Sequence, residues 1–246
     1  NESDRYTFFL RRWYDLPLQI LLEKALKPGD EVVDVGAHVG LFSLAARRVV
    51  GAEGLIHAFE PNPLPCQRLQ QAIALNRLEN IKVYSVGLGE QTGQQSLYFS
   101  PQNSGVGSLQ PPVDDAAAAE MEEILVDMQR GDEILPSAAP RLIKLDVEGA
   151  EMAAMRGCAH LIHQHLPLII YEFIPTQAQQ FNYAFRDLFA LAQQHDYQIF
   201  KVELVYADGQ YDLQLSPITT PDYSDSGDLL LGHIQDPFIQ SMAADS

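Results

Sequence analysis

The sequence predicts an α/β fold in which a mostly parallel sheet is covered by helices on both faces. Short apolar runs alternate along the chain with segments whose apolar residues recur at helical spacing, and this order is typical of parallel sheets. The length of 246 residues suits one large domain, and 46% hydrophobic with 20% charged residues is ordinary for a globular core. The longest apolar runs stay below the 18 residues or so that a membrane span needs.

The first half of the chain begins this alternation. Leu18, Leu21, Leu22 and Ala25 lie on one face of a predicted helix that ends at the Pro-Gly-Asp turn 28–30. Gly and Pro punctuate the segments that follow. In chain order we predict a helix over 18–26, a strand over 31–35, a helix over 41–49, a strand over 54–59, a helix around 66–73 and a strand over 81–86.

Residues 94–135 interrupt the pattern. Two short strands, 95–99 and 124–128, flank a segment over 101–112 that is rich in Gly, Ser and Pro. Long insertions in compact domains are often lids, so we expect 94–135 to form one and 101–112 to be a mobile loop over a binding site.

The alternation then resumes and completes the domain. We predict a strand over 141–145, a helix over 148–164, a strand over 168–171, a helix over 178–195 and closing strands near 197–205 and 228–233. The chain therefore divides into an N-terminal basic-aromatic segment and helix over 1–27, one domain over 28–235, and a polar tail over 236–246.

The charge is strongly acidic. The chain has 16 Lys and Arg against 33 Asp and Glu, a net charge of −17. Such a surface repels phosphate backbones and anionic lipid, so we expect neither a nucleic-acid nor a membrane partner. Arg5, Arg11 and Arg12 cluster with aromatic residues within 1–14, and we hypothesise that this segment docks a partner or a second copy. Cys66 and Cys158 form no metal-type pair, which favours two buried thiols in the cytoplasm.

The turn after the first strand indicates which ligand the sheet binds. Asp34, Gly36 and Gly40 lie where an α/β sheet holds its nucleotide. A dinucleotide fingerprint needs a second glycine where this chain has His38, and the charge of Asp34 opposes a diphosphate. S-adenosylmethionine fits better, because it is cationic and carries no phosphate. Glu60 ends the second strand, where a carboxylate accepts from ribose hydroxyls, and the turn Gly87-Leu88 would lie beside the adenine.

Four segments give a resemblance to a known family. They are 33–40 (VDVGAHVG), 57–62 (HAFEPN), 143–151 (IKLDVEGAE) and 167–172 (PLIIYE). With them, residues 28–235 resemble the FkbM family of S-adenosylmethionine-dependent methyltransferases. The resemblance implies a Rossmann-like class I methyltransferase sheet of seven strands with an antiparallel last strand. We predict a cofactor site of Asp34, Gly36, Ala37, His38, Gly40, Glu60, Pro61, Asn62, Gly87 and Leu88.

A second group of acids follows the fourth and fifth strands. Asp146 and Glu172 end these strands at the same sheet edge as Glu60, and Glu148 follows Asp146. We predict that Asp146 is the base or acceptor-orienting group, with Glu148 and Glu172 supporting it. A Mg²⁺ ion held by these carboxylates is the alternative, which we do not favour because two ligands are few. Glu151 is predicted to be a charge-complemented helix start. Lys144 either neutralises one of these acids or reaches solvent at an exposed position.

The sequence therefore predicts an O-methyltransferase. The resemblance implies transfer to a hydroxyl of a small natural product such as a polyketide, peptide or sugar, and we expect the acceptor to be free or carrier-bound. Two alternatives stay open: a nicotinamide-dependent oxidoreductase, against which His38 and Asp34 argue, and a catalytically silent docking domain of a larger synthase.

Overall fold

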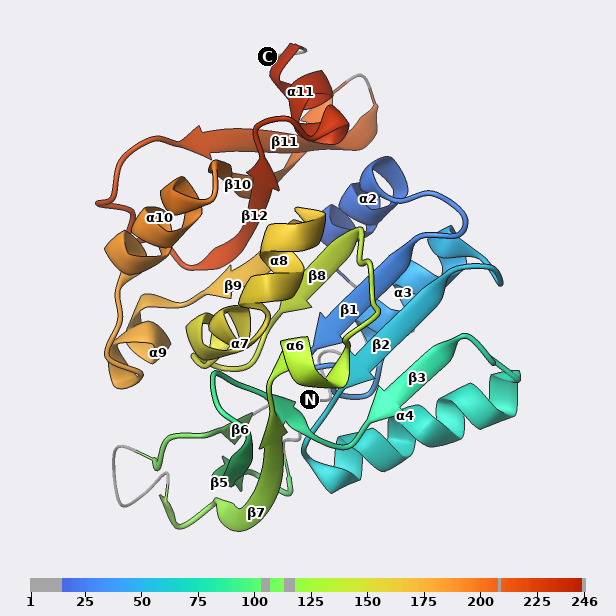
Figure 1. The fold of residues 1–246 in the computed structure, drawn as a ribbon, viewed down its shortest axis with the longest axis vertical. Coiled ribbons are helices and arrows are strands. Elements are labelled where there is room, and N and C mark those ends of the chain that lie inside the picture. Colours follow the sequence, from blue (N-terminus) through green and yellow to red (C-terminus); the bar gives the residue numbers. More distant parts are fainter. Residues whose placement is uncertain (1–14, 103–106, 113–117, 208, 245–246) are drawn as a thin grey trace.

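A computed structural model describes residues 15–102, 107–112, 118–207 and 209–244. Its main sheet has eight strands in the order β11-β10-β12-β9-β8-β1-β2-β3 (Figure 1). These strands are β1 (Glu31–Val35), β2 (Leu55–Phe59), β3 (Ile81–Tyr84), β8 (Leu142–Leu145), β9 (Leu168–Phe173), β10 (Tyr197–Ala207), β11 (Gln210–Ile218) and β12 (Gly227–His233).

The strand directions confirm the predicted sheet. β3, β2, β1, β8 and β9 run parallel, and the last strand, β12, lies antiparallel between β9 and β10. The strand count of seven was too low, because β11 adds an edge strand that pairs with β10 from Ile199↔Ile218 to Ala207↔Gln210. β11 is mostly exposed. It has few apolar residues to bury, so its sequence lacks the apolar run that marked the other strands.

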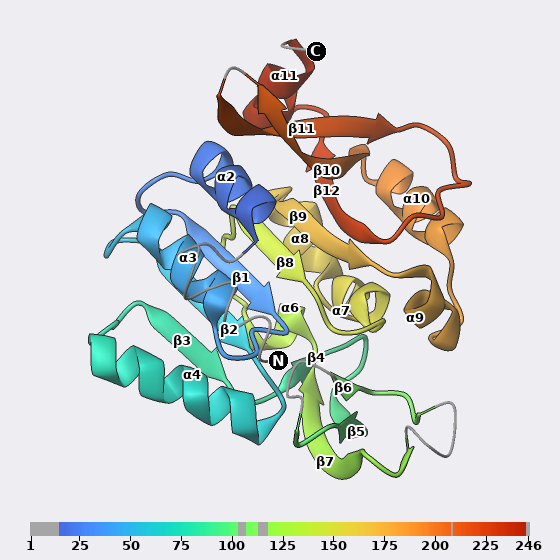
Figure 2. The same ribbon diagram turned by 180° about the vertical axis from the view of Figure 1, so that it is seen from behind.

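Helices cover both faces of the main sheet (Figures 1 and 2). One face packs against α2 (Leu16–Ala25), α3 (Leu41–Val50), α4 (Pro63–Asn76) and α11 (Pro237–Ala244). The other packs against α6 (Gly131–Ile134), α7 (Glu151–Gly157), α8 (Ala159–His165), α9 (Pro175–Gln180) and α10 (Phe185–Gln194). Neighbouring residues of one strand, such as Val32 and Val33, enter the two different cores, as the pleat requires.

Two predicted helices are each split in two. The helix expected over 148–164 breaks at Cys158, because the Asp132 carboxylate of α6 accepts the backbone N–H groups of His160 and Leu161 at 3.2 and 3.0 Å and so starts α8. The helix expected over 178–195 breaks between α9 and α10, where Asn182 is left-handed with φ 59°. Tertiary capping of this kind leaves no local signal in the sequence.

The insertion forms a second, smaller sheet. Its strands are β4 (Gly87–Leu88), β5 (Gly93–Phe99), β6 (Gly107–Ser108) and β7 (Glu122–Gln129), in the order β4-β7-β5-β6. The two predicted strands are confirmed, and β6 takes up part of the predicted loop 101–112. The parallel pair Gly87↔Met128 ties this sheet to the turn after β3.

Both ends of the chain need comment. Residues 1–14, with the basic-aromatic cluster, lie outside the described residues. The segment expected to be a polar tail contains α11, because Ile239 is buried against the main sheet with 2% exposure. Within the described ranges, every helix is too short or too polar to cross a bilayer. Cys66 and Cys158 are free and buried, as expected.

Candidate functional site

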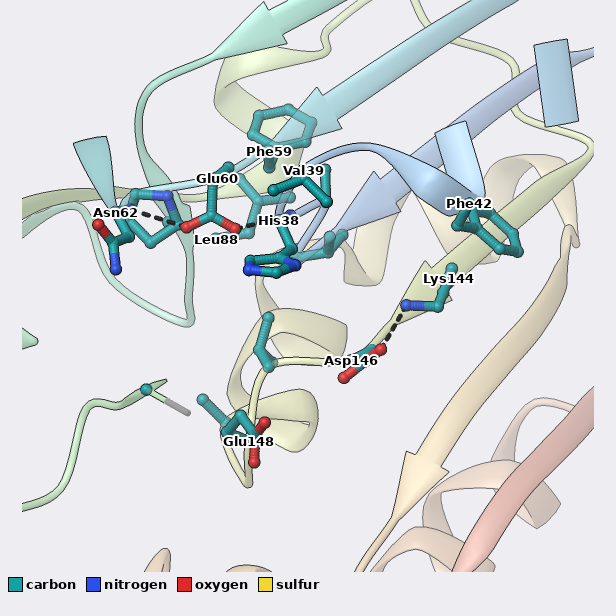
Figure 3. A pocket seen from close by; sticks show the side chains of 18 of the residues that line it. His38, Val39, Phe42, Phe59, Glu60, Asn62, Leu88, Lys144, Asp146 and Glu148 are labelled. Atoms are coloured by element: carbon teal, nitrogen blue, oxygen red, sulfur yellow. Dashed lines mark hydrogen bonds and ion pairs between the residues drawn. The ribbon is translucent and has the colours of Figure 1, made fainter. Parts of the chain in front are cut away.

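A cavity of about 810 Å³ opens at the carboxyl ends of β1, β2 and β8 (Figure 3), and residues of the small sheet, among them Leu97 and Met128, line it as well. Its wall includes almost every predicted site residue: Gly36, Ala37, His38, Glu60, Pro61, Asn62, Gly87, Leu88, Asp146, Glu148 and Glu172. The end of the predicted loop also lines it, through Gly107, Ser108 and Leu109. The predicted residues therefore meet in one space, apart from Asp34 and Gly40.

The turn from β1 to α3 forms one end of the cavity. The backbone N–H groups of Gly36 and Ala37 both donate to the Phe59 carbonyl, at 3.0 and 2.9 Å. Gly36 has φ 84°, and a Cβ at this position would lie 1.8 Å from the Asp146 carbonyl oxygen. Only glycine fits here, because the turn is squeezed between the ends of β2 and β8.

Glu60 is held at the same end by backbone groups. Its Oε2 accepts the His38 N–H and its Oε1 accepts the Asn62 N–H, both at 2.8 Å (Figure 3). Each oxygen keeps a free lone pair, so the carboxylate can still accept from two hydroxyls of a ligand. Burial raises the pKa of Glu60 to about 7, against the lowering effect of these two hydrogen bonds.

Asp34 and Gly40 do not line the cavity, which corrects their predicted role in cofactor contact. Asp34 is fully buried, and its Oδ2 accepts from Ser43 Oγ at 2.6 Å. It lies directly opposite Lys144 in the β1–β8 pair, so its carboxyl group belongs to the interior of the sheet and not to the cavity wall. Gly40 begins α3 with φ 86°, and a Cβ there would lie 2.2 Å from Leu69 Cδ1. Both residues flank the turn from β1 to α3 and support its conformation without lining the cavity.

The other end of the cavity is acidic and contains an internal cation. Lys144 Nζ lies 2.5 Å from Asp146 Oδ2 and 5.3 Å from the centre of the Phe42 ring. The Lys144 side chain is 4% exposed, whereas that of Asp146 is 29% exposed. Asp146 also shares a hydrogen bond with Glu172. The ion pair with Asp146 thus supports a neutralising role for Lys144.

These contacts shift the pKa values of Asp146 and Glu172 in opposite directions. Burial raises the pKa of both, but in Asp146 the charge and hydrogen bond of Lys144, the hydrogen bond from Glu172 and the charge of His38 together lower the net pKa. Glu172 has no such cation; burial and the neighbouring Asp146 charge raise its pKa. The pair therefore shares a proton, and Glu172 is the member whose pKa is raised.

Glu148 and Glu151 lie in different surroundings. The helix expected from residue 148 begins at Glu151, and Glu148 lies in the turn before α7 with φ 55°, lines the cavity and accepts from Gln177 Nε2. Burial, then the Asp146 charge, raises the pKa of Glu148 to about 7. Glu151 is 1% exposed and accepts the N–H groups of Val147 and Gly149 at 2.8 and 3.0 Å. It stabilises the start of α7, as predicted.

The structure adds acids that the sequence analysis missed. Asp228 pairs with Glu172 across β12 and β9, and Asp15 precedes α2. Burial, then the charge of Asp15, raises the pKa of Asp228 to about 7. Neither residue belongs to a local motif: the strand register reveals Asp228, and the packing of the start of α2 reveals Asp15. Among the described residues no three His, Cys, Asp or Glu side chains are placed to hold a metal ion together.

Comparisons with known proteins agree with this geometry. The family described as "Methyltransferase FkbM domain" matches residues 34–199. This chain belongs to the FkbM methyltransferase family. "Methyltransferase 1" of Beauveria bassiana is 30% identical over 56% of this chain and 61% of its own length. "31-O-demethyl-FK506 methyltransferase FkbM" of Streptomyces tacrolimicus is 30% identical over 54% and 60%. The matches thus span about three fifths of these relatives.

The fold is shared with a solved FkbM methyltransferase. The structure from Methylobacillus flagellatus KT has a TM-score of 0.51 and 23% identity, covering 84% of this chain and 44% of that one. The cofactor of the FkbM domain is S-adenosylmethionine, and the cavity fits it. Glu60 offers acceptors for the ribose hydroxyls, and the carboxylates around Asp146 complement a sulfonium and an ammonium. The same acids would repel a diphosphate, which argues against nicotinamide.

Proposed function

We propose that this FkbM domain catalyses S-adenosylmethionine-dependent O-methylation of a hydroxyl on a small natural-product acceptor. The observation that carries the proposal is the single cavity that joins the Glu60 end to the acids Asp146, Glu148 and Glu172. A methyl donor bound at the first end would present its methyl group toward the second. The printed name of the Streptomyces tacrolimicus relative, a 31-O-demethyl-FK506 methyltransferase, supports a hydroxyl acceptor by analogy.

The residues would divide the work as follows. Bound S-adenosylmethionine supplies a methyl carbon that its sulfonium has already activated. Glu60 orients the ribose, and the Gly36 turn sets the depth of binding. Asp146 and Glu172, joined to each other by a hydrogen bond, form the polar wall against which the acceptor is positioned. Alignment of the two reactants accounts for much of the rate enhancement in such a displacement.

Binding and transfer are tested separately. Calorimetry should show binding of S-adenosylmethionine and S-adenosylhomocysteine but not NAD. Trideuteromethyl-labelled cofactor is then incubated with polyketide, peptide and sugar alcohols, free and attached to a carrier protein, and products are read by mass spectrometry. A gain of one labelled methyl on oxygen, unchanged by EDTA, is the expected result. Cofactor binding without transfer to any alcohol would favour the docking-domain alternative, and loss of transfer in EDTA would restore the Mg²⁺ alternative.

The charge of the chain indicates which kinds of partner we propose. The net charge of −17 favours a small neutral or cationic acceptor over nucleic acid or anionic membrane, and the buried free thiols suit the cytoplasm. The basic-aromatic segment 1–14 would dock an acidic carrier or a second copy. Deleting residues 1–14 should then weaken transfer to the carrier-bound acceptor more than to the free one.

A further inference from the structure

His38 is the one imidazole in the described wall of the cavity, and its position is fixed by backbone. It follows Ala37 in the β1–α3 turn with φ 51°, and its N–H donates to Glu60 Oε2 at 2.8 Å. The ring points into the cavity between Glu60 and Asp146 (Figure 3). It therefore lies where the cofactor end and the acidic end meet, beside the place where a methyl group and an acceptor oxygen would come together.

Asp146, the base that the sequence suggested, is poorly suited to take a proton. Its Oδ2 lies 2.5 Å from Lys144 Nζ, and Glu172 donates a hydrogen bond to it. Both contacts stabilise the carboxylate and lower its pKa, and a base with a low pKa is a weak one. General bases work best when their pKa lies near the working pH, which for histidine is the ordinary case.

We propose that the His38 imidazole takes the proton of the acceptor hydroxyl and that Asp146 stabilises the imidazolium that forms. The inference rests on the proposed function. In the step, the acceptor oxygen forms a bond to the methyl carbon while the carbon–sulfur bond breaks and its electron pair goes to sulfur. The hydroxyl proton goes to the imidazole, which releases it to solvent after the products leave. Lys144 is a positioning residue that keeps Asp146 ionised.

The surrounding charges favour the cationic imidazole. Asp146 lies close enough to His38 for the two charges to interact. The charged and titratable side chains in this wall are Glu60, Arg68, Lys144, Asp146, Glu148 and Glu172, with Asp15, Asp34 and Asp228 behind them. Asp146, whose pKa is lowered, is the member of this set that interacts with His38, and its carboxylate stabilises an imidazolium there.

The first test needs no acceptor. The protein is labelled with ¹⁵N-histidine and saturated with S-adenosylhomocysteine, and the His38 ring is titrated by NMR in the wild type and in Asp146→Asn. Loss of the carboxylate should lower the pKa of His38, whereas His160→Asn, which removes an exposed histidine of α8, should not change it. Unchanged titration of His38 in a folded, cofactor-binding Asp146→Asn protein would overturn the pairing.

The second test uses transfer to an alcohol that the wild type methylates. In His38→Asn, asparagine tolerates the left-handed backbone of this position but cannot act as a base. The substitution should lower kcat by about 10²–10⁴-fold with little change in KM. S-adenosylhomocysteine affinity should stay within about threefold, and imidazole should restore turnover to His38→Gly. Near-normal kcat in His38→Asn overturns the proposal. If the wild type transfers to no alcohol, the proposed function fails while the titration still decides the pairing.

Discussion

The two ends of the cavity are built in different ways. At the cofactor end, consecutive residues of one turn are held by backbone hydrogen bonds to Phe59 and Glu60. At the acceptor end, side chains from the ends of β8 and β9 meet only because the sheet places those strands side by side. The first end is a local structure; the second is an assembled one, and its charges depend on one buried lysine.

This difference has an energetic consequence. A backbone-built end tolerates change in its side chains but not in its glycines, because the path of the chain is what defines it. An end built from buried carboxylates tolerates changes that keep its charges balanced, since an unpaired buried charge costs several kcal/mol. The comparison can be tested by disturbing each end where it is most sensitive.

The largest effect is expected for Lys144→Met. Removing the ammonium takes away the cation that both Asp146 and Asp34 interact with, so the free energy of unfolding should fall by about 3–5 kcal/mol, measured in urea. The double variant Lys144→Met/Asp146→Asn should recover part of this loss, because it removes the orphaned charge as well.

Lys201→Met is the matched control. Lys201 and Glu203 repeat the same lysine-x-acid spacing on a strand, with Nζ to Oε1 at 3.1 Å, but both side chains are exposed. Exposed pairs contribute little, so we expect no measurable change. Equal losses in the two lysine variants would show that burial does not distinguish the acceptor end.

A smaller loss is expected for Gly36→Ala at the cofactor end. The left-handed backbone and the clash with the Asp146 carbonyl should together lower the free energy of unfolding by about 2–4 kcal/mol. Gly29→Ala has a similar φ of 91° with no atom within 4 Å of the added Cβ, so it isolates the backbone contribution. If both substitutions lower the free energy of unfolding equally, the close approach of Gly36 to the Asp146 carbonyl at the end of β8 contributes nothing.

What the sequence could predict follows the same division. The glycine turn, Glu60 and the strand ends were found because each belongs to a short segment with its own signal. The split at Cys158 was missed, because α8 is started by Asp132 from another helix. Asp228 and the sharing of a proton between Asp146 and Glu172 depend on strand register. Asp34 was assigned to the cofactor because sequence gives a strand position, not the direction in which a side chain is buried.

At the level of ligand affinity, Glu60→Gln should weaken S-adenosylhomocysteine by about 1.5–3 kcal/mol, since charge-assisted hydrogen bonds to the ribose become neutral ones. Calorimetry at pH 8 measures it. Glu148→Gln removes a carboxylate from the acceptor end of the same wall and should leave the affinity nearly unchanged. A larger effect from Glu148→Gln would reverse the assignment of the two ends.

The smallest effect is the pH dependence of S-adenosylhomocysteine affinity, which distinguishes the contribution of Glu60 from that of Glu148. Burial raises the pKa of Glu60 to about 7 and that of Glu148 also to about 7. If ligand binding needs the ionised Glu60, protonation removes one acceptor as the pH falls through 7. S-adenosylhomocysteine affinity should then be about tenfold lower at pH 6 than at pH 8.

The two glutamine variants show which group is responsible. Glu60→Gln cannot titrate, so its weaker affinity should be nearly constant over this range, whereas Glu148→Gln should keep the full tenfold dependence of about 1.4 kcal/mol. His38 contacts Glu60 through its backbone N–H, so His38→Asn should keep the dependence that Glu60 causes. A dependence that disappears in Glu148→Gln or His38→Asn but persists in Glu60→Gln would place the titrating contact at the acceptor end. The ribose would then have to be held by groups other than the Glu60 carboxylate.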